Sequence, residues 1–135
     1  MQSLLFQLFC LTILSLVFIQ VKHLIIDWIW QPEYEWKNKG TFLHFGGIRH
    51  AGKNAIGTGL VLAFFWGPIG IPLAVLDFII HYTIDLCKMK TNKYYALCPT
   101  KHPQFWWLTG FDQFLHQITY LGLVFVAGYY YIFAK

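Results

Sequence analysis

Charged residues are scarce in this sequence. Only 12% of the 135 residues are Asp, Glu, Lys or Arg, whereas an average soluble domain is about a quarter charged. Apolar residues make up 57% of the chain, and so few charges cannot cover the surface of a water-soluble domain. The composition therefore argues against an ordinary soluble protein and predicts a chain whose main partner is the lipid bilayer.

The sequence also lacks the motifs of several common protein classes. Its three cysteines are an odd number and form no C-x-x-C pair, so neither a disulfide framework nor a cysteine zinc site is indicated. It contains no Gly-rich phosphate loop, no basic–aromatic RNA motif and no Ser-His-Asp pattern. These absences argue against a nucleotide-binding protein, a nucleic acid partner and a serine hydrolase.

Long apolar runs are what the sequence does contain. Polar loops separate four of them, at approximately residues 4–30, 41–66, 71–87 and 105–134. A backbone that crosses a bilayer must satisfy its own hydrogen bonds, so each run is expected to be a helix. We predict an all-α fold, a polytopic membrane protein with one domain over residues 1–135 and about four transmembrane helices in an up-down bundle.

Two of these runs have alternative interpretations. The first resembles a signal peptide, but it has no basic start and no small-residue cleavage site, so we expect it to be retained as a helix. The second carries Arg49 and Lys53 near its start, which leaves only a short apolar part. A re-entrant segment is therefore an alternative to a full span over residues 41–66.

Basic residues gather in two of the three predicted loops. These are Lys37 and Lys39 in the first loop, and Lys88, Lys90, Lys93 and Lys101 in the third. With four spans both loops lie on one side of the membrane, and short basic loops stay in the cytoplasm. We therefore predict a protein of the bacterial inner membrane with the basic loops in the cytoplasm and both termini outside.

Three of the predicted helices carry a His/Asp pair at i,i+4 spacing, which places both side chains on one helix face. The pairs are His23 and Asp27, His81 and Asp85, and Asp112 and His116. In an up-down bundle all three pairs fall at the basic end, where His44 and His50 begin the second run. Ionisable groups in membrane helices face the bundle interior, because contact with lipid is costly. The pairs are therefore expected to converge.

Converging imidazoles and carboxylates suit a divalent metal such as zinc, manganese or iron. The predicted ligands are His23, Asp27, His50, His81, Asp85, Asp112 and His116, and the candidate catalytic groups are Asp27, Asp85 and Asp112. Arg49 and Lys53 are weaker candidates for binding substrate, and snorkelling to the interface is the alternative. The leading hypothesis is a metal-binding membrane protein that hydrolyses a phosphate-bearing or lipid substrate at the cytoplasmic interface.

Two other functions compete with this hypothesis. The cluster could be a structural polar network in a non-enzymatic accessory or phage–host interaction protein. It could also conduct protons or a divalent cation, with Asp77 as a deeper residue of the path. Transport is disfavoured because the outer halves of the first, second and fourth runs contain few polar groups beyond Ser3, Thr12, Ser15 and Thr58.

Several short motifs resemble those of a known family. His23–Gln31 reads H-L-I-I-D-W-I-W-Q, His81–Asp85 reads H-Y-T-I-D, and Phe111–Gln117 reads F-D-Q-F-L-H-Q. Over residues 21–123 the chain resembles an uncharacterised family of small bacterial and phage membrane proteins, with either His44 or His50 matching its second motif. The His and Asp usage is also similar to that of membrane-bound proteins assigned as metal-dependent hydrolases, which implies hydrolysis by analogy alone.

Overall fold

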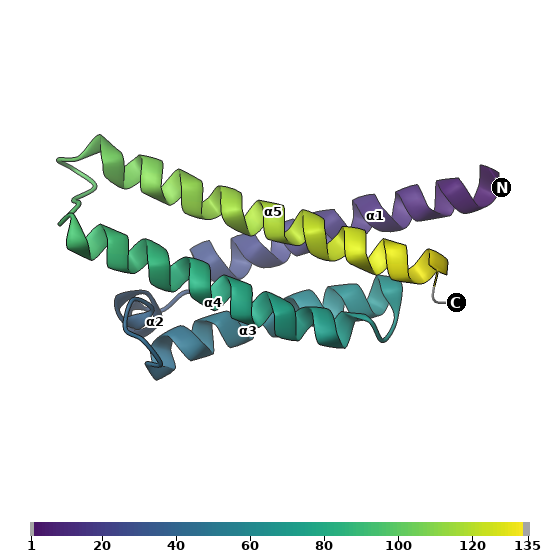
Figure 1. Cartoon of the computed structure of the whole chain (residues 1–135), viewed down its shortest axis with the longest axis horizontal. Coiled ribbons are helices and arrows are strands. Elements are labelled where there is room, and N and C mark those ends of the chain that lie inside the picture. Colours follow the sequence, from purple (N-terminus) through teal and green to yellow (C-terminus); the bar gives the residue numbers. More distant parts are fainter. Residues whose placement is uncertain (1, 134–135) are drawn as a thin grey trace.

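The computed structural model describes residues 2–133 and shows four long helices packed side by side, with a short helix beside them (Figure 1). The long helices are α1 (Gln2–His23), α3 (Phe45–Trp66), α4 (Gly70–Tyr94) and α5 (Pro103–Phe133). A π-helical segment, η1 (Leu24–Ile29), continues α1, and the short helix α2 (Glu33–Asn38) packs against α3. Residues 2–133 contain no strand, so the prediction of an all-helical chain is confirmed.

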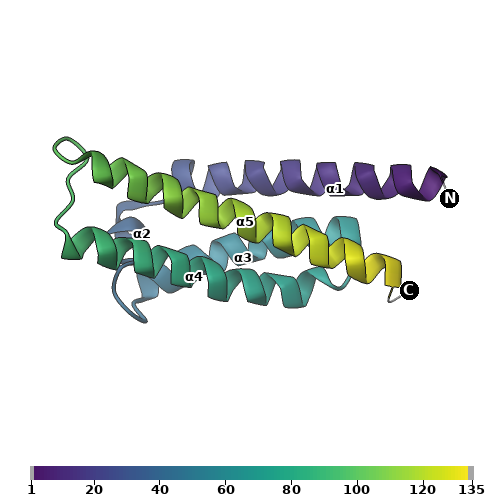
Figure 2. The ribbon, with the colours of Figure 1, turned by 45° about the horizontal axis from the view of Figure 1, so that its top comes forward.

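The long helices alternate in direction along the bundle. The start of α1, the α3–α4 turn and the end of α5 lie at one end of the bundle (Figure 2). Helix α2 and the α4–α5 loop lie at the other end (Figure 2). Gly67 in the α3–α4 turn has φ of 80°, a conformation that favours glycine. A Cβ on Gly70 would lie 2.3 Å from the backbone nitrogen of Ala63. Glycine therefore permits the tight packing of α3 against α4 at this turn.

Many polar residues are buried inside the bundle, and many large apolar residues are exposed on its outside. Fully enclosed polar side chains include His50, Asn54, Thr58, Asp77 and His81. Large apolar side chains are exposed along all four long helices, among them Phe6 (68% exposed), Phe64 (82%) and Phe125 (72%). A soluble monomer rarely presents such extended apolar surface to water.

Two helical stretches are long and apolar enough to cross a membrane, Gln2–Ile29 and α4. The other two long helices have 22 residues (α3) and 31 residues (α5). Glycines and two basic residues lower the hydropathy of α3, and glutamines and tyrosines lower that of α5. Two of the four predicted spans therefore have helices of suitable length and apolarity, and the other two stay a prediction.

The element boundaries differ from the expected ones mainly at the basic end. The polar run after Pro32, expected as a loop, contains α2, whose first turn carries Glu33 and Glu35 and whose last turn carries Lys37. This charge order matches the helix dipole. Helix α4 ends at Tyr94 rather than at 87, and the predicted end of the last helix at 134 lies outside the described residues.

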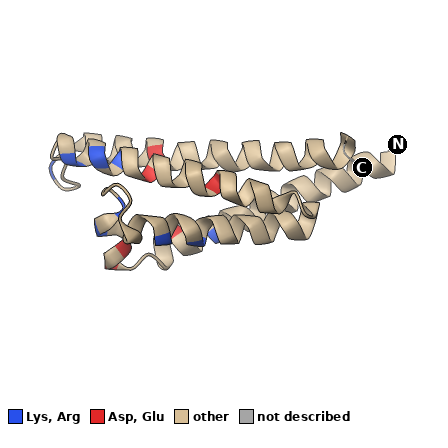
Figure 3. Cartoon of the chain, turned by 60° about the horizontal axis from the view of Figure 1, so that its bottom comes forward, with Lys and Arg blue, Asp and Glu red and all other residues tan. Residues whose placement is uncertain are grey.

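The interior has an apolar part and a polar part. The apolar part contains Ile19, Leu62, Trp66, Leu73, Tyr120, Leu123, Val124 and Ala127. The polar part lies nearer the end of the bundle that is away from the start of α1 and the end of α5. Lys and Arg gather at that same end (Figure 3). The fold therefore places the histidines and the basic residues in the same half of the bundle.

Candidate metal centre

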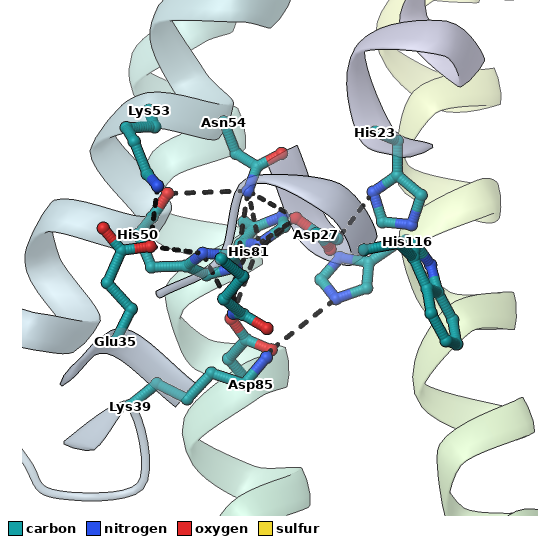
Figure 4. Close-up of polar contacts among 12 residues, drawn as sticks. His23, Asp27, Glu35, Lys39, His50, Lys53, Asn54, His81, Asp85 and His116 are labelled. Carbon is teal, nitrogen blue, oxygen red and sulfur yellow. Dashed lines mark hydrogen bonds and ion pairs between the residues drawn. The ribbon is translucent and has the colours of Figure 1, made fainter. Parts of the chain in front are cut away.

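Side chains from α1, η1, α3, α4 and α5 meet in one buried group (Figure 4). We call this group the polar cluster, and it consists of His23, Asp27, His50, His81, Asp85, Asp112 and His116. Each of these side chains is at most 6% exposed. The structure thus brings together all seven residues that the sequence indicates as metal ligands.

The π-helical segment η1 positions Asp27. Its wider turn is closed by the backbone N–H of Trp30, which donates to the carbonyl of Ile25 at 2.6 Å. The Asp27 carboxylate lies 3.2 Å from Nδ1 of His23, one turn earlier. π-Helical turns are rare and often occur at functional sites, where they re-aim a side chain.

Three ligand atoms from three segments form a triangle at the centre of the polar cluster. Nε2 of His50 lies 3.2 Å from Nε2 of His81 and 3.4 Å from Oδ1 of Asp27, and the third edge is 3.8 Å. Tetrahedral ligands at about 2.0–2.1 Å from a zinc ion lie about 3.4 Å from one another. This triad has the chemistry and the spacing to hold a metal ion.

A second triad shares His81 with the first. The ligand atoms of His81, Asp85 and His116 lie within 4.8 Å of one another. Oδ2 of Asp85 is also 3.3 Å from Nε2 of His50, and Nε2 of His116 is 3.7 Å from Oδ1 of Asp112. Further donors therefore surround the first triad.

Three buried atoms of the polar cluster have no hydrogen-bond partner within residues 2–133. They are Nδ1 of His81, Oδ1 of Asp112 and Nε2 of His116. A buried polar atom without a partner costs about 1–3 kcal/mol. Nε2 of His116 and Oδ1 of Asp112 lie 3.7 Å apart, and this imidazole and carboxylate pair fits a cation. Nδ1 of His81 lies on the opposite side of its ring from the Nε2 that faces the centre.

Glu35 of α2 lies behind His50. Its Oε2 is 3.5 Å from Nδ1 of His50, whose Nε2 faces the centre. Glu35 also pairs with Arg49 at 2.7 Å and with Lys53 at 2.7 Å. A carboxylate behind a ligating histidine is typical of metal sites. Arg49 and Lys53, the predicted substrate-binding residues, thus neutralise a buried carboxylate in the structure.

His23 has protein partners at both ring nitrogens. Its Nε2 donates at 2.9 Å to Oε1 of Gln113, and the indole N–H of Trp28 donates to the same oxygen. Its Nδ1 lies 3.0 Å from the Tyr120 hydroxyl and 3.2 Å from Asp27. Protein groups thus contact both ring nitrogens of His23, whereas His50 and His81 direct ring nitrogens at the centre.

Two further polar side chains complete the network on the inner side. Nδ2 of Asn54 donates to Oδ1 of Asp27 at 2.7 Å and lies 3.1 Å from Nε2 of His81. Lys22 donates to Oδ1 of Asn54 at 3.1 Å and to the Tyr120 hydroxyl at 3.2 Å. The sequence does not identify Asn54 or Lys22 as site residues, because neither belongs to a recognisable motif.

Lys39, which follows α2, reaches the polar cluster from the loop. Its Nζ lies 2.7 Å from Oδ1 of Asp85, and the two side chains are 10% and 3% exposed. Burial disfavours the charged lysine, but the carboxylates of Asp85, Asp27 and Asp112 together outweigh that effect and raise the pKa of Lys39. Lys39 therefore contributes a fixed positive charge next to Asp85.

The remaining candidates lie away from the centre. The side chain of His44 caps α3 by accepting the backbone N–H of Gly46, so the structure places His50, and not His44, in the polar cluster. Asp77 is buried deeper on α4 and accepts a hydrogen bond from Thr58 at 2.6 Å. Asp77 on α4 is thus hydrogen-bonded to a residue of α3.

A pocket of about 230 Å³ opens onto the polar cluster between η1 and α5. Asp27, Asp112, Lys39 and Lys88 contribute charged groups to its lining. Its other lining residues are Trp28, Gln31, Phe105, Trp106, Thr109 and Gln113. We call it the mouth pocket, because it connects the outside of the bundle with two carboxylates of the cluster.

Comparison of the chain with models of protein families, with characterised proteins and with solved structures finds no match. The resemblance carried by the His and Asp motifs stays a prediction. The function must therefore be inferred from the geometry of the polar cluster.

Proposed function

We propose that this chain is an integral membrane protein that binds a divalent metal ion in the polar cluster and uses it for hydrolysis at the cytoplasmic interface. The observation that carries the proposal is the triad of Asp27, His50 and His81. Its three ligand atoms lie 3.2–3.8 Å apart in a buried site surrounded by further imidazoles and carboxylates.

The distribution of polarity supports the membrane part of the proposal. Apolar side chains cover the outside of α1, α3, α4 and α5, and the ionisable groups are enclosed between the helices. This is the arrangement that lipid favours, because charged groups in hydrocarbon are costly. In the proposed topology α3 and α5 span together with α1 and α4, and the loops that carry Lys37 and Lys93 are cytoplasmic.

Charge balance supports a divalent ion. Asp27, Asp85 and Asp112 bring three negative charges into the polar cluster, and Lys39 offsets one of them. Among residues 2–133, Asp27 and Asp112 have only histidines as ion-pair partners, so with neutral imidazoles both carboxylates can take up a cation.

Each residue then has a role. Asp27, His50 and His81 hold the ion, and Asp85 and His116 are the adjacent donors. A divalent ion supplies a Lewis acid and a water of lowered pKa. Oδ1 of Asp112 is free to accept a proton, while Gln113 fixes Oδ2 of the same carboxylate at 3.0 Å. Asp112 is accordingly our candidate general base.

A structural polar network is the second candidate function, and the position of Asn54 favours it. The Asn54 amide donates to Asp27 and lies against His81, so protein groups alone satisfy part of the polar cluster. In that case the residues fix helix packing in an accessory protein. Metal content separates the two proposals.

The first experiment measures metal in protein purified in mild detergent. Wild type and the control His44→Ala are expected to carry stoichiometric zinc, manganese or iron, and His81→Ala is expected to carry none. Because an ion that binds only the folded state adds its binding free energy to stability, chelator should lower the melting temperature of the first two proteins only. Wild-type protein that is metal-free, and whose melting is unmoved by chelator or added metal, contradicts the proposal.

The second experiment tests hydrolysis with a general phosphate-ester probe such as p-nitrophenyl phosphate. Asp112→Asn keeps the shape of the side chain and removes the base, so it should retain metal and lose about 10²–10⁴-fold in rate. Full activity in a metal-loaded Asp112→Asn variant would remove Asp112 from the chemistry.

A further inference from the structure

We propose that the mouth pocket receives a phosphate group and that Lys88 is the side chain that binds it. The inference rests on the proposed function for its ligand, the phosphate group of the hydrolysed substrate. The ion held by Asp27 would also offset the charge of one carboxylate that lines the same pocket. Lys88 takes the substrate-binding role that the sequence suggested for Arg49 and Lys53, because Arg49 and Lys53 form ion pairs with Glu35.

The mouth pocket has the size and the polarity for a charged headgroup. Its volume of about 230 Å³ corresponds to nearly eight water molecules at about 30 Å³ each. Asp27 and Asp112 lie on the side of the polar cluster, and Lys39 and Lys88 add two cations. A phosphate in this pocket would meet the metal ion and lysine together, which is a common way of binding a phosphoryl group.

Lys88 differs from Lys39 and Lys53 because no ion pair holds it within residues 2–133. Lys39 pairs with Asp85, Lys53 pairs with Glu35, and Lys22 donates to Asn54. Within residues 2–133 no carboxylate lies in ion-pair distance of Lys88, whose Nζ sits 5.8 Å from the centre of the Phe105 ring. Asp112 lines the same pocket but lies beyond ion-pair distance, so the half-buried ammonium group of Lys88 has no direct anionic partner, and an anionic ligand would supply one.

The walls of the mouth pocket indicate what the phosphate is attached to. Trp28 and Trp106 line it and are 59% and 58% exposed, and Phe105 lies beside Lys88. Exposed tryptophans at the end of a bundle are typical of the membrane interface. The pocket therefore suits a phosphate monoester, carried by a lipid headgroup or by a soluble molecule, with the aromatic walls favouring an apolar portion.

The experiment measures binding to metal-loaded protein in detergent by calorimetry, with inorganic phosphate as the first probe. Lys88→Gln should weaken binding about 10–100-fold, the loss expected for a charge-assisted hydrogen bond of about 1.5–3 kcal/mol. Lys88→Arg should restore most of the affinity. The matched control is Lys93→Gln, an exposed lysine on the same helix that does not line the pocket, and it should bind as wild type does.

Two further probes identify the source of the phosphate. Tighter binding of dioctanoyl phosphatidic acid than of inorganic phosphate supports a lipid headgroup, and equal binding supports a soluble phosphate. Dioctanoylglycerol has the same acyl chains without the phosphate and should not bind. If it binds as well as phosphatidic acid does, the phosphate is not what the pocket recognises and the inference is overturned.

Metal content measured in the same samples separates this inference from the proposed function. Metal-loaded wild type that binds none of the phosphate probes, or Lys88→Gln that binds like wild type, overturns the inference and leaves the metal site standing. Metal-free protein that still binds phosphate through Lys88 supports the pocket and contradicts the metal site. Metal-free protein that binds no phosphate contradicts both.

Discussion

The buried acidic side chains in this bundle differ in their partners, and the partner limits what each carboxylate can do. Glu35 forms ion pairs with Arg49 and Lys53, and Asp77 accepts a hydrogen bond from Thr58. These two carboxylates stabilise the packing of α2 and of α4 against α3. Asp27 instead faces the imidazole nitrogens of His50 and His81. Neutral imidazoles do not neutralise the Asp27 carboxylate, so the carboxylate can bind a metal ion.

Lys39→Gln tests the ion pair between Lys39 and Asp85. Removing one partner leaves a buried charge uncompensated, so we expect a loss of about 3–5 kcal/mol in the free energy of unfolding. The pKa of Lys39 is raised in the folded state, so its contribution is fully present below the unfolded-state pKa and is lost only as pH rises through the folded-state value. The difference in melting temperature from wild type should therefore be the same at pH 7 and pH 9.

The control for this variant is Lys37→Gln, which removes an exposed lysine that pairs with Glu33 on α2. Exposed pairs contribute about 0–1 kcal/mol, so this variant should melt close to wild type. If Lys39→Gln is no more destabilising than Lys37→Gln, the buried pair does not form.

His23→Gln tests whether His23 orients Asp27 or binds metal itself. Because both ring nitrogens of His23 have protein partners, the variant should keep one metal ion per chain and bind it about 10–100-fold more weakly. His50→Ala removes a proposed ligand and should lose the ion altogether. Titration with a competing chelator measures both affinities. Equal and complete loss in the two variants would make His23 a ligand.

At the scale of helices, close packing at the α3–α4 turn requires glycine. A Cβ at position 70 would lie 2.3 Å from a backbone nitrogen of α3, a clash that the backbone must move to relieve. Gly70→Ala should therefore destabilise the protein by at least about 1–3 kcal/mol, measured as a lower melting temperature in detergent.

Gly122→Ala on α5 is the matched control for the clash. A Cβ at position 122 meets no atom within 4 Å among the described residues. Alanine is favoured over glycine inside a helix by about 0.5–1 kcal/mol, so this variant should be neutral or slightly stabilising. A melting temperature for Gly70→Ala as high as that for Gly122→Ala would show that α3 and α4 are further apart than the structure places them.

At the scale of the whole molecule, the orientation in the membrane can be measured with cysteines introduced at the two ends. In a background with the three native cysteines replaced by serine, Pro68→Cys in the α3–α4 turn should react with an impermeant maleimide added to intact cells. Lys93→Cys at the basic end should react only after the membrane is opened, because basic loops stay in the cytoplasm. The reverse labelling pattern would invert the proposed topology.

The pairing of His and Asp within one helix follows from local sequence. Residues four apart share a helix face, so His81 and Asp85 had to lie together once α4 formed. The cost of placing a charge in lipid then predicts that the pairs turn inward and meet, which is the arrangement seen. Helical class and the location of the polar cluster at the basic end were therefore readable from composition and spacing.

The partners across helices were decided by the tertiary structure alone. Whether Arg49 and Lys53 face a substrate or a buried carboxylate depends on where α2 packs, and nothing in the polar run after Pro32 signals that packing. The choice of His50 over His44, the contact of Asn54 with Asp27, and the reach of Lys39 to Asp85 depend likewise on helix rotation and axial position. Sequence periodicity states which side chains share a face, but rotation and axial position arise from packing between segments far apart in the chain.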